Sequence, residues 1–128
     1  MASRHAIAAL LLATLVVVPL AAHHSNVAFD VEEVRQITGV VERFQWVNPH
    51  TWIHLRVDDG NGGTVEWAFE GRPPGVLRRA GWSRDSLPVG QAVTVYYSPA
   101  KDGSPTGLVA RVTLADGTVL ANAPPPTR

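Results

Sequence analysis

Runs of alternating apolar and polar residues, separated by turn-forming residues, make up most of the chain after residue 34. Such alternation is typical of β-strands, because successive side chains point to opposite faces of a sheet. Asn48-Pro49 and the glycine-rich loop over 59–63 are turn signals that separate the first three runs. The pattern predicts strands over residues 35–47, 51–58, 64–70, 92–98, 107–114 and, more briefly, 118–120.

The segment between the third and fourth predicted strands has a different pattern. Pro74 suits the first position of a helix, and Gly81 suits the left-handed position just after a helix end, which predicts a helix of about two turns. Three strands, a helix and then two strands is the order of an OB-type Greek-key barrel. We therefore predict an all-β fold, a small five- to six-stranded OB-like barrel with one short helix between strands three and four. A six-stranded SH3-like barrel and a small sandwich are the alternatives.

The alternation also assigns side chains to the two faces of each strand. In the second strand, Trp52, His54 and Arg56 are predicted to point outward. Glu66 and Glu70 of the third strand are also predicted to point outward, with Arg56 close to Glu66 across the hairpin. The residues predicted to point inward from the second, third and fifth strands are Ile53, Leu55, Val57, Val65, Trp67, Phe69, Leu108, Ala110, Val112 and Leu114.

The first 22 residues have the parts of a secretory signal peptide: a positive start with Arg4, an apolar run and small residues at its end. The run covers residues 6–22, contains Pro19, and is short for a membrane-spanning helix, which needs about 20 apolar residues. A retained membrane anchor is the alternative. We predict cleavage after Ala22, with Ala21 as a second option, and a bacterial periplasmic or secreted protein with no membrane span after cleavage.

The rest of the chain divides into an N-terminal segment over 23–33, a β-barrel domain over 34–121 and a disordered proline-rich tail over 122–128. The sequence has 11 basic and 11 acidic residues, and loss of Arg4 with the signal leaves 10 basic residues. Such a neutral chain lacks the basic footprint of a nucleic-acid binder. It has no cysteine, which excludes disulfides, thiolate metal sites and thiol nucleophiles.

The stretch W-V-N-P-H-T-W-I-H gathers the aromatic and imidazole side chains that are the best candidates for a binding surface. Asn48-Pro49 makes a turn, and the side chains near it are predicted to lie at one rim of the barrel. Amphipathic tryptophan and histidine side chains at a rim either cover the barrel edge or form a small recognition site. The candidate ligand-binding residues are Trp46, Asn48, His50, Trp52 and His54.

Histidines also suggest a metal site, with His23, His24, His50 and His54 as candidate ligands. On one strand His50 and His54 are roughly 13 Å apart between Cα atoms, too far to chelate one ion together. If the mature chain begins at His23, its amine and imidazole can chelate Cu(II), and His50 or His54 can complete a set of three nitrogens that suits copper. The alternative is that His23 and His24 are only a polar flank after the signal.

Catalytic patterns are absent from the sequence. The carboxylates have no spacing diagnostic of acid–base catalysis, the serines have no nucleophile-elbow context, and the G-N-G-G loop is not a phosphate-binding motif. An enzyme is therefore the least supported class of function.

Several short motifs together resemble a known family. They are H-H-S, Phe29-Asp30, V-N-P-H-T-W, W-A-F-E, G-W-S-R-D-S-L and K-D-G-S, in this order along the chain. The ordered set is similar to an uncharacterised family of exported bacterial proteins, domain of unknown function 6152. The resemblance covers nearly the whole mature chain and implies a small exported all-β protein. It implies no activity, substrate, cofactor or catalytic residue.

We hypothesise that the protein is an exported β-barrel that binds a protein, glycan or small molecule without catalysis, through the candidate residues of the W-V-N-P-H-T-W-I-H stretch. The first alternative is a periplasmic protein that binds copper or another metal through its N-terminal histidines. The second is a structural envelope protein without a ligand. A nucleic-acid ligand is disfavoured by the neutral charge and the predicted compartment.

Overall fold

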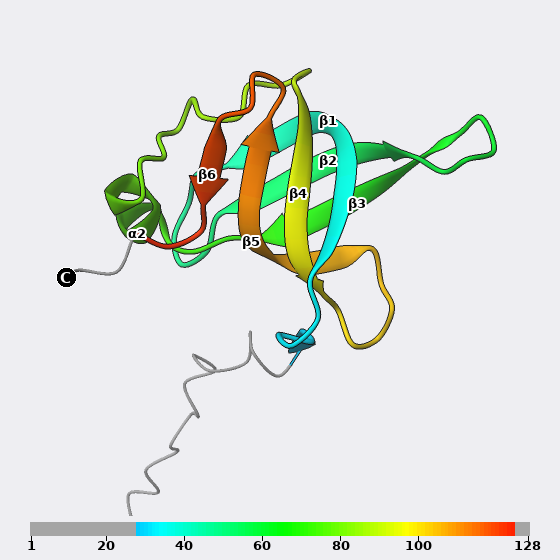
Figure 1. The fold of residues 1–128 in the computed structure, drawn as a ribbon, viewed down its shortest axis with the longest axis horizontal. Helices are drawn as coiled ribbons and strands as arrows, with labels where there is room; N and C mark the ends of the chain where they lie inside the picture. The colour runs from blue at the N-terminus through cyan, green and yellow to red at the C-terminus, as the bar shows by residue number, and fades with distance from the viewer. Residues whose placement is uncertain (1–27, 125–128) are drawn as a thin grey trace, which may run out of the picture.

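The computed structural model describes residues 28–124, which form a small β-barrel with a short helix at one side (Figure 1). Within these residues, the strands and the helix between the third and fourth strands are β1 (Arg35–Gln45), β2 (Trp52–Asp58), β3 (Thr64–Glu70), α2 (Pro74–Arg79), β4 (Ala92–Pro99), β5 (Thr106–Leu114) and β6 (Val119–Ala121). The predicted all-β class and the place of the helix are confirmed.

The strand order is that of a closed five-stranded barrel with one added strand. Neighbouring strands pair in the order β3-β2-β1-β4-β5-β6, and a parallel pairing of β3 with β5 closes the barrel. In Figure 1 β4 and β5 cross in front of β2 and β3, so the two halves of the barrel enclose the core. The predicted OB-like barrel is confirmed over the SH3-like and sandwich alternatives.

β1 belongs to both halves of the barrel because it curves from one to the other (Figure 1) and changes its partner near Gly39. Its first half pairs with β4, and its second half, from Val40, pairs with β2. A Cβ at Gly39 would lie 2.8 Å from the carbonyl oxygen of Arg56. Only glycine allows the two strands to approach this closely at the bend.

The predicted inward face of β2 is confirmed: Ile53, Leu55 and Val57 are all buried in one apolar core. From β3, Phe69 is fully buried and stacks on Trp67, which is half-buried at the margin of this core. The prediction is wrong for Val65, which is exposed because it lies near the tip of the hairpin that extends beyond the barrel (Figure 1).

The inward positions predicted for β5 are only half right, because a β-bulge reverses the alternation within this strand. Tyr96 of β4 pairs with Arg111, but Tyr97 pairs with Val109, so Ala110 is an extra residue. Val109 is therefore buried and Ala110 is exposed. Leu108 is half-buried on the outer side, whereas the predictions after the bulge hold: Val112 is buried and Leu114 packs against the core.

α2 and the segment after it fill the side of the barrel next to β6. Leu77 and Trp82 are buried in the core, and the Trp82 ring packs against Phe44, with the ring centroids 5.9 Å apart. The indole Nε1–H of Trp82 donates a hydrogen bond to the carbonyl oxygen of Ala121 at 2.7 Å. The side chain of Trp82 thus ties the helical segment to the last strand.

The two ends of the described chain are both held against the barrel. Phe29 is buried, and the backbone N–H of Asp30 donates to the carbonyl oxygen of Pro99 at 2.9 Å. Asn122, which the sequence assigned to the tail, is also buried. Its side-chain amide donates to the carbonyl of Val109 at 2.7 Å and accepts from the N–H of Arg72 at 3.0 Å. The ordered domain therefore includes Asn122.

Candidate functional site

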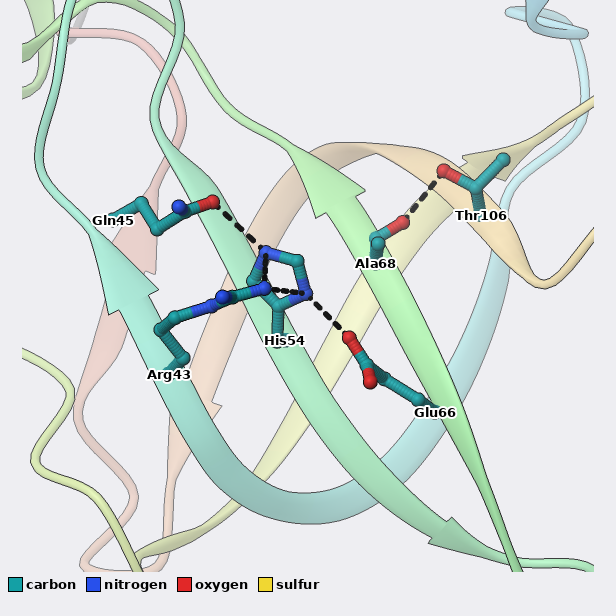
Figure 2. Close-up of polar contacts among 6 residues, drawn as sticks. All are labelled: Arg43, Gln45, His54, Glu66, Ala68 and Thr106. Atoms are coloured by element: carbon teal, nitrogen blue, oxygen red, sulfur yellow. Dashed lines mark hydrogen bonds and ion pairs between the residues drawn. The ribbon is translucent and has the colours of Figure 1, made fainter.

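A cluster of charged and polar side chains lies on the outer face of β1, β2 and β3. We call its six members the His54 cluster: Glu42, Arg43, Gln45, His54, Arg56 and Glu66. In the strand register, His54 of β2 lies between Arg43 of β1 and Ala68 of β3. Figure 2 shows Arg43 and Gln45 approaching His54 from β1, and Glu66 approaching it from β3.

His54 is at the centre of this cluster, and both of its ring nitrogens face oxygen acceptors. Nδ1 lies 2.8 Å from Oε1 of Glu66, and Nε2 lies 3.0 Å from Oε1 of Gln45 (Figure 2). A ring that donates from both nitrogens is the charged imidazolium, whereas a rotated Gln45 amide would donate to a neutral ring. The cluster therefore has hydrogen bonds for either protonation state of His54. Its side chain is only 12% exposed.

Arg43 lies against the His54 ring rather than in line with either ring nitrogen. One guanidinium nitrogen, Nη2, is 3.2 Å from Nδ1 and also 3.2 Å from Nε2. The lone-pair directions of the two nitrogens diverge, so one donor cannot lie along both. The contact is therefore a close approach of one guanidinium nitrogen to the ring, made by an arginine that is exposed at the surface.

A second ion pair joins the ends of the cluster on β1 and β2. Nη1 of Arg56 lies 2.9 Å from Oε1 of Glu42. Arg56 and Glu66 are strand partners, as predicted. They do not form an ion pair with each other. Glu66 takes His54 as its partner and Arg56 takes Glu42.

A β-bulge in β1 places two consecutive charged residues in the cluster. Val41 pairs with Leu55 and Arg43 pairs with His54, so Glu42 is the extra residue. Without the bulge, strict alternation would turn Arg43 to the same side as the buried Val41. The sequence prediction missed Glu42 and Arg43. The signal for them was present in V-V-E-R-F, where two polar residues interrupt the alternation.

An open hollow of about 260 Å³ lies in this surface. It is lined by Glu42, Arg43, His54 and Glu66, all of which carry charged or hydrogen-bonding groups. Ala68, whose side chain is a single methyl group, is the strand partner of His54 on β3. In Figure 2 no strand or helix of the described chain passes in front of the cluster. The hollow is therefore accessible to a ligand from solution.

His50 belongs to a separate contact at the start of β2. Its Nδ1 lies 3.1 Å from Oε1 of Glu70 and 3.3 Å from the carbonyl oxygen of Gly71, both of which are acceptors. Nδ1 therefore carries the hydrogen. Glu70 was predicted to point outward like Glu66, but unlike Glu66 it is buried. His50 and His54 thus have different carboxylate partners.

The remaining residues of the W-V-N-P-H-T-W-I-H stretch take different positions. Trp46 is only 7% exposed and packs edge-on against Phe44, so it is part of the core rather than of a surface. Asn48 is exposed in the turn before β2, next to the cis peptide bond that precedes Pro49. Trp52 is half-buried on the outer face, the next outward position along β2 from His54. Of the five predicted ligand-binding residues, only His54 lines the hollow.

The candidate metal ligands are not brought together within the described chain. His23 and His24 lie outside the described residues, and within residues 28–124 no group of three histidine, aspartate or glutamate side chains could hold an ion. The Cu(II) site therefore stays a prediction from the sequence. No helix within residues 28–124 is long and apolar enough to cross a membrane.

Fold and site together define a small OB-like β-barrel with a polar hollow on the outer face of its first three strands. A family model, the family of unknown function DUF6152, matches residues 11–111. The chain belongs to this family, which confirms the resemblance that its motifs showed. No curated protein and no solved structure matches the chain.

Proposed function

We propose that this protein is an exported, non-catalytic binding module that holds a small polar ligand, or a polar group of a larger one, at the His54 cluster. The observation that carries the proposal is the open hollow, whose four lining residues all have hydrogen-bonding groups. Ligand sites are concave and contain a few convergent polar groups, and this hollow has both features. Its volume is slightly below the usual range for drug-sized ligands, which favours a small occupant.

The polar side chains of the hollow are already held in position before a ligand arrives. His54 is fixed by Glu66, Gln45 and Arg43, and Glu42 is fixed by Arg56. Ordering a long side chain on binding costs about 0.5–1.5 kcal/mol, so groups that are ordered beforehand make binding more favourable. Mutual contacts of this kind are typical of binding sites built on rigid strands.

The position of the cluster in the barrel also supports a binding role. OB-type barrels bind their ligands on the face of the second and third strands and on the loops beside it. The cluster lies on that face, because its central residue is on β2 and Glu66 is on β3. This support comes from fold-level analogy, and the side chains themselves carry the more specific argument.

Native mass spectrometry of the protein incubated with a bacterial small-molecule extract tests the proposal. We expect a defined mass adduct on the native protein that is lost in Arg43→Ala. The matched control is Arg111→Ala, which removes an arginine from the outer face of β5, where it stacks on Tyr96. Equal retention of the adduct in both variants, or no adduct on the native protein, would contradict the proposal.

Export is the second part of the proposal, and it rests on the signal-like pattern of residues 1–22. Expression of the full chain in a bacterial host and intact-mass analysis of the periplasmic fraction test it. We expect a chain that begins at His23. Full-length protein that remains in the membrane fraction would show a retained anchor instead.

A further inference from the structure

We infer that the ligand of the His54 cluster is an uncharged polyhydroxylated molecule, a saccharide unit that presents two adjacent hydroxyl groups to Arg43 and a neighbouring carboxylate. This inference rests on the proposed function and adds the chemical class of the ligand. It follows from the charge balance of the hollow, from its free donors and acceptors, and from its size.

The charges around the hollow nearly cancel. Glu42 and Glu66 of the lining supply two negative charges. Arg43 of the lining supplies one positive charge, and Arg56, which pairs with Glu42 beside the hollow, supplies the second. His54 adds at most one more positive charge. An anionic ligand would meet the two carboxylates of the lining, and a cationic ligand would meet the guanidinium of Arg43, so either would be repelled at part of the site. A neutral ligand meets no such repulsion.

Some hydrogen-bond donors and acceptors of the residues that line the hollow have no partner among residues 28–124. Within the described part of the chain, each of the two carboxylates uses only Oε1 for its hydrogen bond, which leaves Oε2 of Glu42 and of Glu66 as acceptors. Among residues 28–124, Arg43 uses only Nη2 for such contacts, so its Nε and Nη1 remain as donors. A hydroxyl group both donates and accepts, so two adjacent hydroxyls can satisfy a carboxylate oxygen and the guanidinium together.

The surroundings of the hollow suit a flat ring of small size. A hollow of about 260 Å³ has room for one or two small rings, not for a long chain buried along its length. Ala68, the strand partner of His54, has only a methyl side chain beside the ring. Trp52, half-buried on the same face, offers an apolar ring surface at the next outward position of β2. A saccharide has hydroxyl groups for the cluster and a C–H face for an indole.

An apolar ligand does not fit the same observations. It would cover Glu66, whose side chain is 57% exposed, and Arg43 without offering them hydrogen bonds. Removing charged groups from water without a partner is costly. The polar lining therefore selects for a ligand rich in hydrogen-bonding groups.

The test is a titration of the ¹⁵N-labelled domain with neutral sugars, followed by the amide signals of Arg43, His54 and Glu66. The probes are methyl glucoside, methyl mannoside, methyl galactoside and their disaccharides. The controls are glucosamine as a cation, glucuronate as an anion and a per-O-methylated glucoside, which has no hydroxyl donors. We expect saturable shifts with at least one neutral sugar and at least about tenfold weaker binding of its methylated form, since each lost bond to a charged group weakens binding by about this factor.

Two variants separate loss of the site from loss of the fold. Ala68→Leu fills the space beside His54 and is expected to weaken sugar binding by about tenfold or more while the remaining amide signals stay in place. Arg111→Ala removes an arginine from another face and is expected to leave binding unchanged. Equal binding by Ala68→Leu and the native protein would show that the sugar does not occupy the hollow, and would overturn the inference.

The outcomes also distinguish this inference from the proposed function. If glucosamine or glucuronate saturates the same amides and no neutral sugar does, the ligand class is wrong but the binding site stands. If no neutral sugar gives saturable shifts anywhere, the saccharide inference is overturned. If, in addition, the native mass spectra show no adduct, the proposed function fails as well.

Discussion

Replacement of Asn122 by alanine tests how the segment after β6 stabilises the barrel next to the start of β2. The Asn122 side chain connects three parts of the chain that are far apart in sequence. Its Oδ1 accepts from the backbone N–H of Arg72, and its Nδ2 donates to the carbonyl oxygen of Val109. The carbonyl of Arg72 in turn accepts a hydrogen bond from the hydroxyl of Thr51 at 2.9 Å. These bonds align the start of β2 with the end of β3, where His50 and Glu70 lie.

The expected cost of Asn122→Ala is about 1.5–4.5 kcal/mol of the free energy of unfolding. Losing the hydrogen bond from the Arg72 N–H costs about 0.5–1.5 kcal/mol, and leaving the buried carbonyl of Val109 without its partner costs about 1–3 kcal/mol. This is a large fraction of the roughly 5–15 kcal/mol by which small domains are stable. For a domain of this size, the expected fall in Tm is about 10–25 °C.

Urea unfolding followed by tryptophan fluorescence, together with a thermal scan, measures this cost. The matched control is Asn61→Ala, an exposed residue of the β2–β3 hairpin, and we expect it to change stability by less than about 0.5 kcal/mol. A loss below about 1 kcal/mol in Asn122→Ala would refute the reasoning. It would mean that water replaces the Asn122 side-chain amide at no cost. Asn122 would then not help to hold Arg72 and Thr51 in position.

Further predictions concern the glycines and a buried tyrosine. In α2, the Cβ of Gly75→Ala would meet no atom within 4 Å, so this change should raise the free energy of unfolding by about 0.5–1 kcal/mol. The Cβ of Gly107→Ala would meet the Tyr97 ring and lie 2.9 Å from the Ser98 carbonyl oxygen. This change should therefore lower the free energy of unfolding by about 1–3 kcal/mol. Equal effects in urea unfolding would contradict the observed close approach. Burial raises the pKa of Tyr97 above 10.0. The buried neutral phenol therefore contributes its full stabilisation to the folded state below pH 10.0, and this stabilisation is lost as the pH rises through the raised pKa. Unfolding measured between about pH 8 and 11 should show a smaller alkaline loss of stability in Tyr97→Phe, and an identical profile would count against this assignment.

Much of the fold could be predicted from the sequence because the local signals agree with one another. Alternation, the turn signals and the proline–glycine pair around the helix all indicate the observed elements, within about two residues at each end. The inward faces of β2 and most of β3 follow from simple alternation. Such agreement is expected where local preference and tertiary packing favour the same structure.

The errors arise where a bulge or a long-range contact changes the local rule. The bulge at Ala110 reverses the faces within β5, and the bulge at Glu42 turns Arg43 outward. Glu70 is buried and contacts His50, and Asn122 is buried and bonds to Val109; the local sequence pattern encodes neither contact. The candidate binding residues predicted from the sequence are centred on the turn, and the hollow lies further along β2, at His54.

The most direct test of the central claim is to locate a bound ligand by intermolecular nuclear Overhauser effects. The sample is the labelled protein saturated with the neutral sugar that binds it most tightly in the titration. We predict contacts from the sugar protons to the ring of His54 and to the indole of Trp52. Contacts only to the ring of Tyr96, on the outer face of β4, would show that the protein binds its ligand elsewhere and that the His54 cluster is only a set of surface ion pairs.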